Sequence, residues 1–140
     1  MSSRKLILHL FCAISITPAL ARGQCPVNTV MVHGHVDHPQ PNSKVQVQLV
    51  YPKREPGESA QTNLDDNTFH IPIEFLTQSN KPLFKNVHAK CDRKPSTVVI
   101  TLMTGDRQSD QVTLGLLKDF DHLDASAYTL RHEVTLITLH

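Results

Sequence analysis

Residues 44–51 read Lys-Val-Gln-Val-Gln-Leu-Val-Tyr, and this stretch decides the fold class. Apolar side chains stand at positions 45, 47, 49 and 51, and polar ones stand at positions 44, 46 and 48. Because successive side chains of a β-strand point to opposite faces, this period of two predicts a strand with one buried and one solvated face. An antiparallel sheet that covers a core on one side is typically built from such strands.

The same alternation continues along the chain on both sides of this stretch. It predicts further strands over residues 30–36, 68–75, 83–91, 97–103 and 128–139, separated by turn-forming residues. Turns at intervals of about 8 to 12 residues, with little helical periodicity, are typical of a β-sandwich. We therefore expect an all-β, antiparallel, immunoglobulin-like sandwich of about seven strands.

Three segments are less regular. Residues Pro52–Ser59 contain two prolines and a glycine among charged residues, which predicts a solvated loop. Pro72 has no backbone N–H, so its strand should lie at the edge of a sheet or carry a bulge. The alternation over residues 112–116 fits a sixth strand, whereas residues 113–122 also fit a short amphipathic helix, and the sequence leaves both open.

The first 21 residues have the organisation of a secretory signal peptide. Arg4 and Lys5 form a basic region, Leu6–Ile16 form an apolar run, and Ala19-Leu20-Ala21 supplies the small residues of a cleavage site. The apolar run is shorter than the roughly 20 residues that span a membrane, and no later run is longer. We expect residues 1–21 to be removed and residues 22–140 to form one secreted, extracellular domain without a transmembrane segment.

The cysteines agree with an extracellular location. Cys12 belongs to the expected signal peptide, so Cys25 and Cys91 remain. A pair of cysteines in an oxidising compartment predicts one disulfide bond. A catalytic thiol is the alternative, but neither cysteine belongs to a Cys-x-x-Cys or Cys-His motif. A loop of about 65 residues closed by this bond adds roughly 4 kcal/mol of stability in the chain-entropy model.

Charge and aromatic content argue against nucleic-acid binding. The chain has 14 Lys and Arg and 13 Asp and Glu, and loss of Arg4 and Lys5 with the signal peptide changes the net charge from +1 to −1. A surface with so balanced a charge does not follow a phosphate backbone. Aromatic residues make up 5% of the chain and Trp is absent, which is too little for a base-stacking platform. We therefore expect no nucleic-acid partner.

Histidine is the one unusual ingredient, because His33, His35 and His38 fall within six positions. Residues two apart on a strand share a face at a distance of about 6.5 to 7 Å, so His33 and His35 could bind one metal ion together with His38 from the following turn. Imidazole ligands suit zinc or copper. The alternative is that His33 and His35 belong to the solvated face opposite Val32 and Val36, and that the protein has no cofactor.

No catalytic motif stands out in the chain. The G-x-S-x-G sequence of seryl hydrolases is absent, and Asp65 and Asp66 lie in a turn signal without an identifiable partner. We therefore expect the protein not to be an enzyme. The alternative from a different class is a hydrolase or metal-dependent enzyme that uses His33, His35 and His132, which requires these side chains to meet in one concave site.

Four segments together resemble transthyretin-like (prealbumin-like) secreted proteins. They are Val32-His33-Gly34-His35-Val36, Lys44-Val45-Gln46-Val47-Gln48-Leu49, Asn67-Thr68-Phe69-His70-Ile71 and His88-Ala89-Lys90-Cys91-Asp92. The resemblance covers about the first two thirds of the chain after the signal peptide, and it implies a small secreted sandwich. Hydroxyisourate hydrolases belong to the same superfamily, and His35-Val36-Asp37 is similar to their early histidine strand. Their C-terminal Tyr-Arg-Gly-Ser signature is absent here.

Signal peptide, disulfide and sandwich together favour a small secreted binding protein without enzymatic activity. Two kinds of ligand remain open: an extracellular or host protein bound at strand edges and loops, and a small apolar molecule bound between the sheets. The composition is also similar to that of small secreted effectors of plant-associated fungi and other parasites, which implies a partner at a host interface. The alternative is a histidine-based metal-binding protein or hydrolase. The sequence leaves the oligomeric state open.

Overall fold

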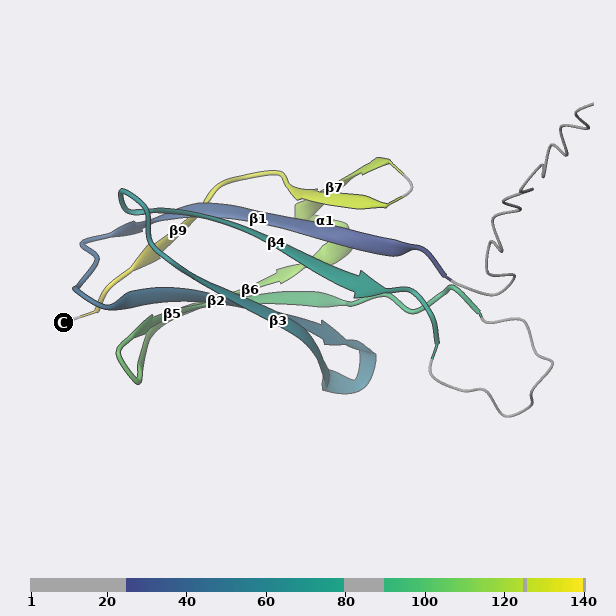
Figure 1. Cartoon of the computed structure of the whole chain (residues 1–140), viewed down its shortest axis with the longest axis horizontal. Coiled ribbons are helices and arrows are strands. Elements are labelled where there is room, and N and C mark those ends of the chain that lie inside the picture. The colour runs from purple at the N-terminus through teal and green to yellow at the C-terminus, as the bar shows by residue number, and fades with distance from the viewer. Residues whose placement is uncertain (1–24, 80–89, 125, 140) are drawn as a thin grey trace, which may run out of the picture.

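The computed structural model describes residues 25–79, 90–124 and 126–139, and these residues form two layers of β-sheet (Figure 1). The expected signal peptide, residues 1–21, lies outside the described residues. The strands are β1 (Val27–Asp37), β2 (Ser43–Tyr51), β3 (Glu55–Asn63), β4 (Thr68–Leu76), β5 (Thr97–Thr104), β6 (Arg107–Gly115), β7 (Phe120–Asp124), β8 (Ala127–Leu130) and β9 (Val134–Ile137). A 3-10 turn η1 (Pro52–Arg54) and a short helix α1 (Leu116–Asp119) complete the set.

Each layer is one sheet. The first sheet has the strand order β4-β1-β8-β7, and β9 also pairs with β1. The second sheet has the order β3-β2-β5-β6. All pairings are antiparallel except that β1 runs parallel to β8 and to β9. The all-β sandwich is thus confirmed and its sheets are mostly antiparallel, while the two parallel pairings of β1 depart from the predicted antiparallel arrangement.

The core lies between the sheets and is built from one phase of each alternating strand. In β1 the even-numbered positions from residue 28 to residue 36 are buried, and in β2 the odd-numbered positions from residue 43 to residue 51 are buried. The buried cluster consists of Val30, Val32, Val36, Val45, Val47, Leu49, Phe69, Ile71, Ile73, Phe75, Val98, Ile100, Leu102, Leu116, Phe120, Tyr128, Leu130, Val134 and Leu136. Period-two patterning alone placed nearly all of these residues on the inner face.

The expected loop over Pro52–Ser59 is wrong beyond its first three residues. Pro52 begins the 3-10 turn, and the chain then enters β3 at Glu55. β3 pairs only with β2 among the described strands, so Pro56 occupies an edge strand, where a missing N–H is tolerated. Gly57 is required at this point, because a β-carbon there would collide with the ring of Tyr51.

The C-terminal third divides into more elements than the alternation predicts. The ambiguous segment is a strand up to Gly115, a helical turn over α1, and then the strand β7. The expected strand over 128–139 breaks at residues 131–133 into β8 and β9, so the described residues form nine strands rather than about seven. The strand expected over 83–91 falls outside the described residues except for Lys90 and Cys91, which are not in a strand. No helix among the described residues is long and apolar enough to cross a membrane.

Pro72 lies in an edge strand without a bulge, the first of the two alternatives that the sequence left open. Its strand β4 pairs with β1 from Val27↔Leu76 to His35↔Thr68 without a shift in register. At the start of β4 the backbone of Thr68 bonds to Asp65, at 2.8 and 3.0 Å, on the side away from β1. Backbone groups of a strand alternate in direction, so residue 72 faces the same open side. The missing N–H of the proline therefore costs no hydrogen bond to β1.

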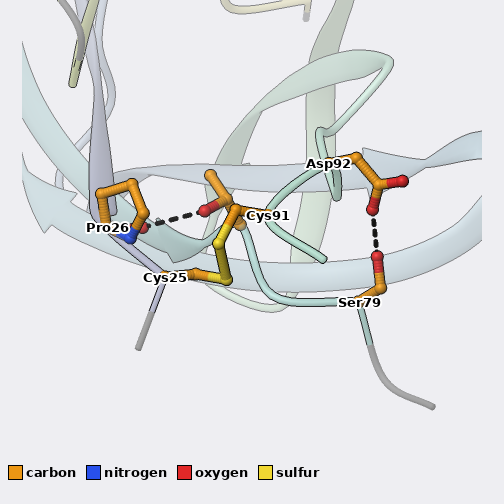
Figure 2. The surroundings of a disulfide bond; sticks show 6 residues. Cys25, Pro26, Ser79, Cys91 and Asp92 are labelled. Atoms are coloured by element: carbon orange, nitrogen blue, oxygen red, sulfur yellow. Dashed lines mark hydrogen bonds between the residues drawn. A yellow bond between two sulfur atoms is a disulfide. The ribbon is translucent and has the colours of Figure 1, made fainter. Parts of the chain in front are cut away.

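The disulfide between Cys25 and Cys91 joins the start of β1 to the segment before β5 (Figure 2), which confirms the predicted pairing. The two cysteines are 66 positions apart. Nearby, the Thr77 hydroxyl donates to the carbonyl of Pro26 at 3.1 Å, and the Ser79 hydroxyl donates to the carboxylate of Asp92. The disulfide and these two hydrogen bonds together join three segments at one end of the sandwich: the start of β1, the residues after β4 and the segment before β5.

We expect the Cys25→Ala/Cys91→Ala double variant to lose about 4 kcal/mol of unfolding free energy, because the bond restricts a long loop of the unfolded chain. Urea denaturation of the oxidised protein and of the variant measures the difference. A loss below about 1 kcal/mol would show that the loop restriction contributes little.

Substitution of Gly34 should destabilise the fold more than substitution of Gly105. A β-carbon at Gly34 would collide with the backbone carbonyl of Val134 and lie 2.6 Å from Cζ of Phe69. Gly105 has open space around it and a φ of +60°. We expect Gly34→Ala to cost about 3 kcal/mol by overpacking and Gly105→Ala about 1 kcal/mol by backbone strain. Denaturation curves give both values, and an equal cost would contradict the close packing at Gly34.

Candidate functional site

The outer face of the first sheet carries the histidines that the sequence singles out. On β1 the side chains at positions 29, 31, 33 and 35 are half-buried, in the phase opposite to the core residues. His33 and His35 therefore share the outer face, as their spacing predicts. The register of β4 sets His70 directly opposite His33, so three imidazoles lie on neighbouring positions of this face.

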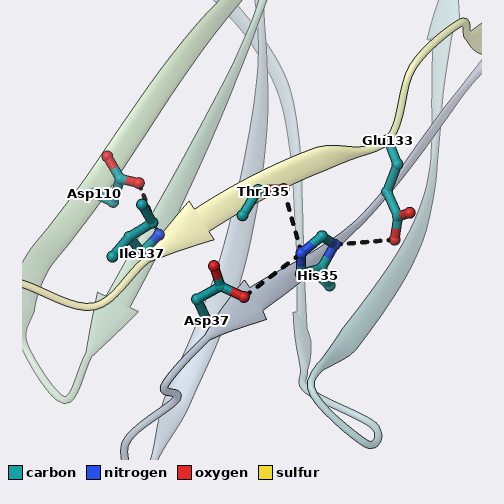
Figure 3. Close-up of polar contacts among 6 residues, drawn as sticks. All are labelled: His35, Asp37, Asp110, Glu133, Thr135 and Ile137. Carbon is teal, nitrogen blue, oxygen red and sulfur yellow. Dashed lines mark hydrogen bonds and ion pairs between the residues drawn. The ribbon is translucent and has the colours of Figure 1, made fainter.

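His35 already has protein partners on both ring nitrogens (Figure 3). Its Nδ1 lies 3.2 Å from Oε1 of Glu133, and its Nε2 lies 3.3 Å from the hydroxyl of Thr135 and 3.6 Å from Oδ1 of Asp37. Both ring nitrogens thus lie within hydrogen-bonding distance of a side chain, Nδ1 of Glu133 and Nε2 of Thr135. A metal ion at His35 would have to displace one of these partners.

His38 does not extend the row formed by His33 and His35. β1 ends at Asp37, and His38 follows it as an exposed residue with a φ of +55° at the start of the turn. In the described part of the chain, no three His, Cys, Asp or Glu residues are placed so that they could hold a metal ion together. Zinc or copper binding by His33, His35 and His38 thus stays a prediction.

The connection between β8 and β9 brings a different residue to the histidines from the one expected. His132 is exposed in this connection, but its neighbour Glu133 is the residue that contacts His35. On the opposite side of β9, Oδ2 of Asp110 accepts a hydrogen bond of 2.9 Å from the backbone N–H of Ile137 (Figure 3). These polar contacts thus join β9 to β1 within the first sheet and to β6 of the second sheet. A hydrolytic role for His132 stays a prediction.

The same outer face changes character toward the disulfide. Val27 and Leu76 are partners across β1 and β4, and 47% and 51% of their surfaces are exposed. Two further outward pairs lie between this pair and the histidines, Thr29 with Glu74 and Met31 with Pro72. The face therefore has a polar end at the histidines and an apolar end at Val27 and Leu76, beside the open edge of β4.

The open edge of β4 presents backbone groups without a strand partner. Because residues 68 and 72 point their backbone away from β1, His70, Glu74 and Leu76 do so as well. No described strand other than β1 pairs with β4. The edge and the exposed apolar pair form one surface, which we call the β4 surface and define by His70, Pro72, Glu74, Leu76 and Val27.

A second polar cluster lies near the disulfide and is structural. The hydroxyl of Tyr51 donates to Oε2 of Glu58 at 2.7 Å, and the guanidinium of Arg93 lies 3.5 Å from the centre of the Tyr51 ring and 3.3 Å from Oε1 of Glu58. Burial of the ring and the neighbouring Glu58 raise the pKa of Tyr51 well above its usual range. Every member is engaged, so the cluster fastens β2 and β3 to the segment after Cys91.

Sequence reasoning missed the residues that join His33 and His35 in space. His70 and Glu133 come from β4 and from the loop before β9, and only the strand register sets them beside β1. The outward phase of His70 was readable from the alternation with Phe69 and Ile71. Which strand it would face was not readable, because the sequence contains no signal for register between distant strands.

We expect zinc and copper to bind more weakly than about micromolar, because His33 and His70 offer two free imidazoles while His35 is engaged. Calorimetry of the oxidised protein should show that His33→Ala and His70→Ala each reduce the weak binding and that His35→Ala does not. Tight stoichiometric binding that the His33→Ala/His35→Ala variant loses would instead establish the metal site expected from sequence.

Comparisons with models of protein families, with curated proteins and with solved structures gave no match. The resemblance to transthyretin-like proteins therefore stays a prediction made from the four sequence segments.

Proposed function

We propose that this chain is a secreted, non-enzymatic binding protein that captures an extracellular protein at the β4 surface. The observation that carries the proposal is the open edge of β4 with the exposed pair Val27 and Leu76 beside it. A partner strand can add to such an edge through backbone hydrogen bonds, while apolar side chains give additional affinity. We further propose that the sandwich belongs to the transthyretin-like class and that the partner lies at a host interface.

Pro72 shapes the partner that this edge accepts. It removes one N–H from the middle of the open side, so hydrogen bonding to an added strand is interrupted between His70 and Glu74. An interrupted edge disfavours indiscriminate pairing of copies of the same chain, as prolines do on other edge strands. Specific capture then depends on the segment near Glu74 and Leu76, where pairing and apolar contact coincide.

The packing between the sheets favours a protein partner over a small apolar ligand. Val47, Leu49, Ile100 and Leu136 have no exposed surface, and side chains from both sheets fill the interior between them. A ligand between the sheets would have to displace these side chains, with the cost of reopening a close-packed core. The histidine-based metal-binding protein or hydrolase remains the alternative, and its support is the row of His33, His35 and His70.

A photo-reactive residue at position 76 should cross-link the partner, whereas one at Thr113, on the outer face of the second sheet, should not.

With the partner identified and purified, Leu76→Lys should weaken binding at least about tenfold, because it places a charge in an apolar contact. Glu74→Pro should do the same by removing an N–H from the open edge. Thr113→Lys is the matched control and should leave affinity unchanged.

Two results would overturn the proposal. One is a partner that cross-links equally at positions 76 and 113. The other is an affinity that both edge variants leave unchanged while their denaturation curves show an intact fold. Concentration-dependent dimerisation lost in Glu74→Pro would instead show that the edge pairs with a second copy.

A further inference from the structure

A polar pocket lies at the end of the sandwich opposite the disulfide, between the β1–β2 turn and the β3–β4 turn. Its volume is about 740 Å³. The polar residues that line it are Gln40, Asn42, Ser43, Lys44, Asn63, Asp66 and Asn67, and Pro39, Pro41 and Leu64 complete the lining. Four of these seven polar residues are amides, while the two charged residues, Lys44 and Asp66, have opposite signs.

The four amide side chains are available to a ligand. Gln40, Asn42, Asn63 and Asn67 are exposed, and their side chains make no hydrogen bond to any described residue. Each amide offers two N–H donors and one carbonyl acceptor. Asn42 and Asn67 also have positive φ angles of 66° and 67°, which asparagine tolerates, so the backbone alone explains an asparagine at these two positions. Gln40 and Asn63 have no such backbone reason.

The walls of the pocket are held by their own hydrogen bonds. In the first turn the Ser43 hydroxyl donates to the carbonyl of Gln40 at 2.7 Å and accepts from its N–H at 3.1 Å. In the second turn the backbone carbonyl of Asn67 accepts from the N–H of Val36 at 2.7 Å, and Asp65 pairs with Thr68. A pocket whose turns are fixed in advance loses little conformational entropy when a ligand binds.

The pocket borders the outer face of the second sheet. A row here means the four outward residues that are partners across β3, β2, β5 and β6, and the two rows nearest the pocket contain no charged residue. Lys44 and Asn63 are partners across β2 and β3 and line the pocket. The following rows across the four strands are Gln61, Gln46, Thr101 and Gln111, and then Ser59, Gln48, Val99 and Thr113. Gln111 contacts the Thr101 hydroxyl at 3.4 Å, so the polar atoms of a row are neighbours.

From this arrangement we infer that the pocket binds the end of a neutral oligosaccharide. The rest of the sugar chain extends over the two uncharged rows of the second sheet, which contain Gln46, Gln48, Gln61 and Gln111. Sugar hydroxyls both donate and accept hydrogen bonds, and the amides of Gln40 and Asn63 do the same without adding charge. An anionic ligand would find one lysine, Lys44, opposed by Asp66. An apolar ligand would leave the amides without partners, at a cost for each.

This site is separate from the β4 surface, and neither proposal depends on the other. Leu76 lies at the end of β4 nearest the disulfide, whereas the pocket lies beyond the beginning of β4. Either binding proposal can therefore be wrong while the other holds. A variant at one site serves as the control for the other.

The test uses the oxidised protein with neutral hexasaccharides of glucose, N-acetylglucosamine, mannose and xylose, and with an oligogalacturonate as the acidic probe. We expect one neutral hexasaccharide to saturate with a Kd of about 1 mM or tighter in calorimetry. In NMR spectra its addition should shift the side-chain amide signals of Gln40 and Asn63. Gln40→Ala/Asn63→Ala should weaken binding at least about tenfold, and Leu76→Lys should leave it unchanged.

A length series adds a check of the chain direction. Gln46→Ala/Gln61→Ala should weaken the binding of the hexasaccharide at least about threefold and leave the affinity for the disaccharide unchanged, because only the longer ligand reaches these residues. Saturation by the oligogalacturonate alone, binding that the Gln40→Ala/Asn63→Ala variant retains, or no binding of any neutral probe would each overturn the inference. Denaturation curves of the variants verify that they are folded.

Discussion

The close approach of β9 and Phe69 to β1 at Gly34 is the contact on which the rest of the structure depends. β1 is hydrogen-bonded on one side to β4 and on the other to β8 and then β9, so one strand organises the whole first sheet. A side chain at residue 34 would push away the carbonyl of Val134 and the Phe69 ring together. Because glycine stands there, β9 closes over the core and brings Glu133 and Thr135 to His35.

The centrality of β1 explains why the surfaces of this protein differ so much. The side chains on its inner face belong to the core, and those on its outer face include His33 and His35. Its neighbour β4 lies at the edge of the sheet. On the second sheet, the two rows of residues next to the pocket carry uncharged side chains. Two surfaces with different chemistry thus lie on one small sandwich: an open strand edge with the exposed apolar pair Val27 and Leu76 near the disulfide, and an amide-lined pocket at the far end.

The alternation of apolar residues predicted β1, β2, β4 and β5 closely, because a strand with one buried face repeats every two residues whatever it pairs with. Local pattern failed for β3, where exposed edge positions carry no apolar phase and the prolines indicated a loop. It also failed at residues 131–133, since the break between β8 and β9 depends on how both fit along β1. Part of the candidate site was predictable from sequence, because the spacing of His33 and His35 places them on one face of a strand. No feature of the sequence indicated that His70 and Glu133 would lie beside them.

The sequence by itself therefore determined the all-β class, the inward residues, the restriction of Pro72 to an edge strand or a bulge and the pairing of Cys25 with Cys91. These follow from side-chain period, from the chemistry of proline and from there being two cysteines after the expected leader. Only the tertiary structure decided the parallel pairing of β8 and β9 with β1, the partners of His35, and the meeting of two distant turns around the amide pocket. Register between distant strands is set by packing across the whole core, which no local stretch of sequence contains.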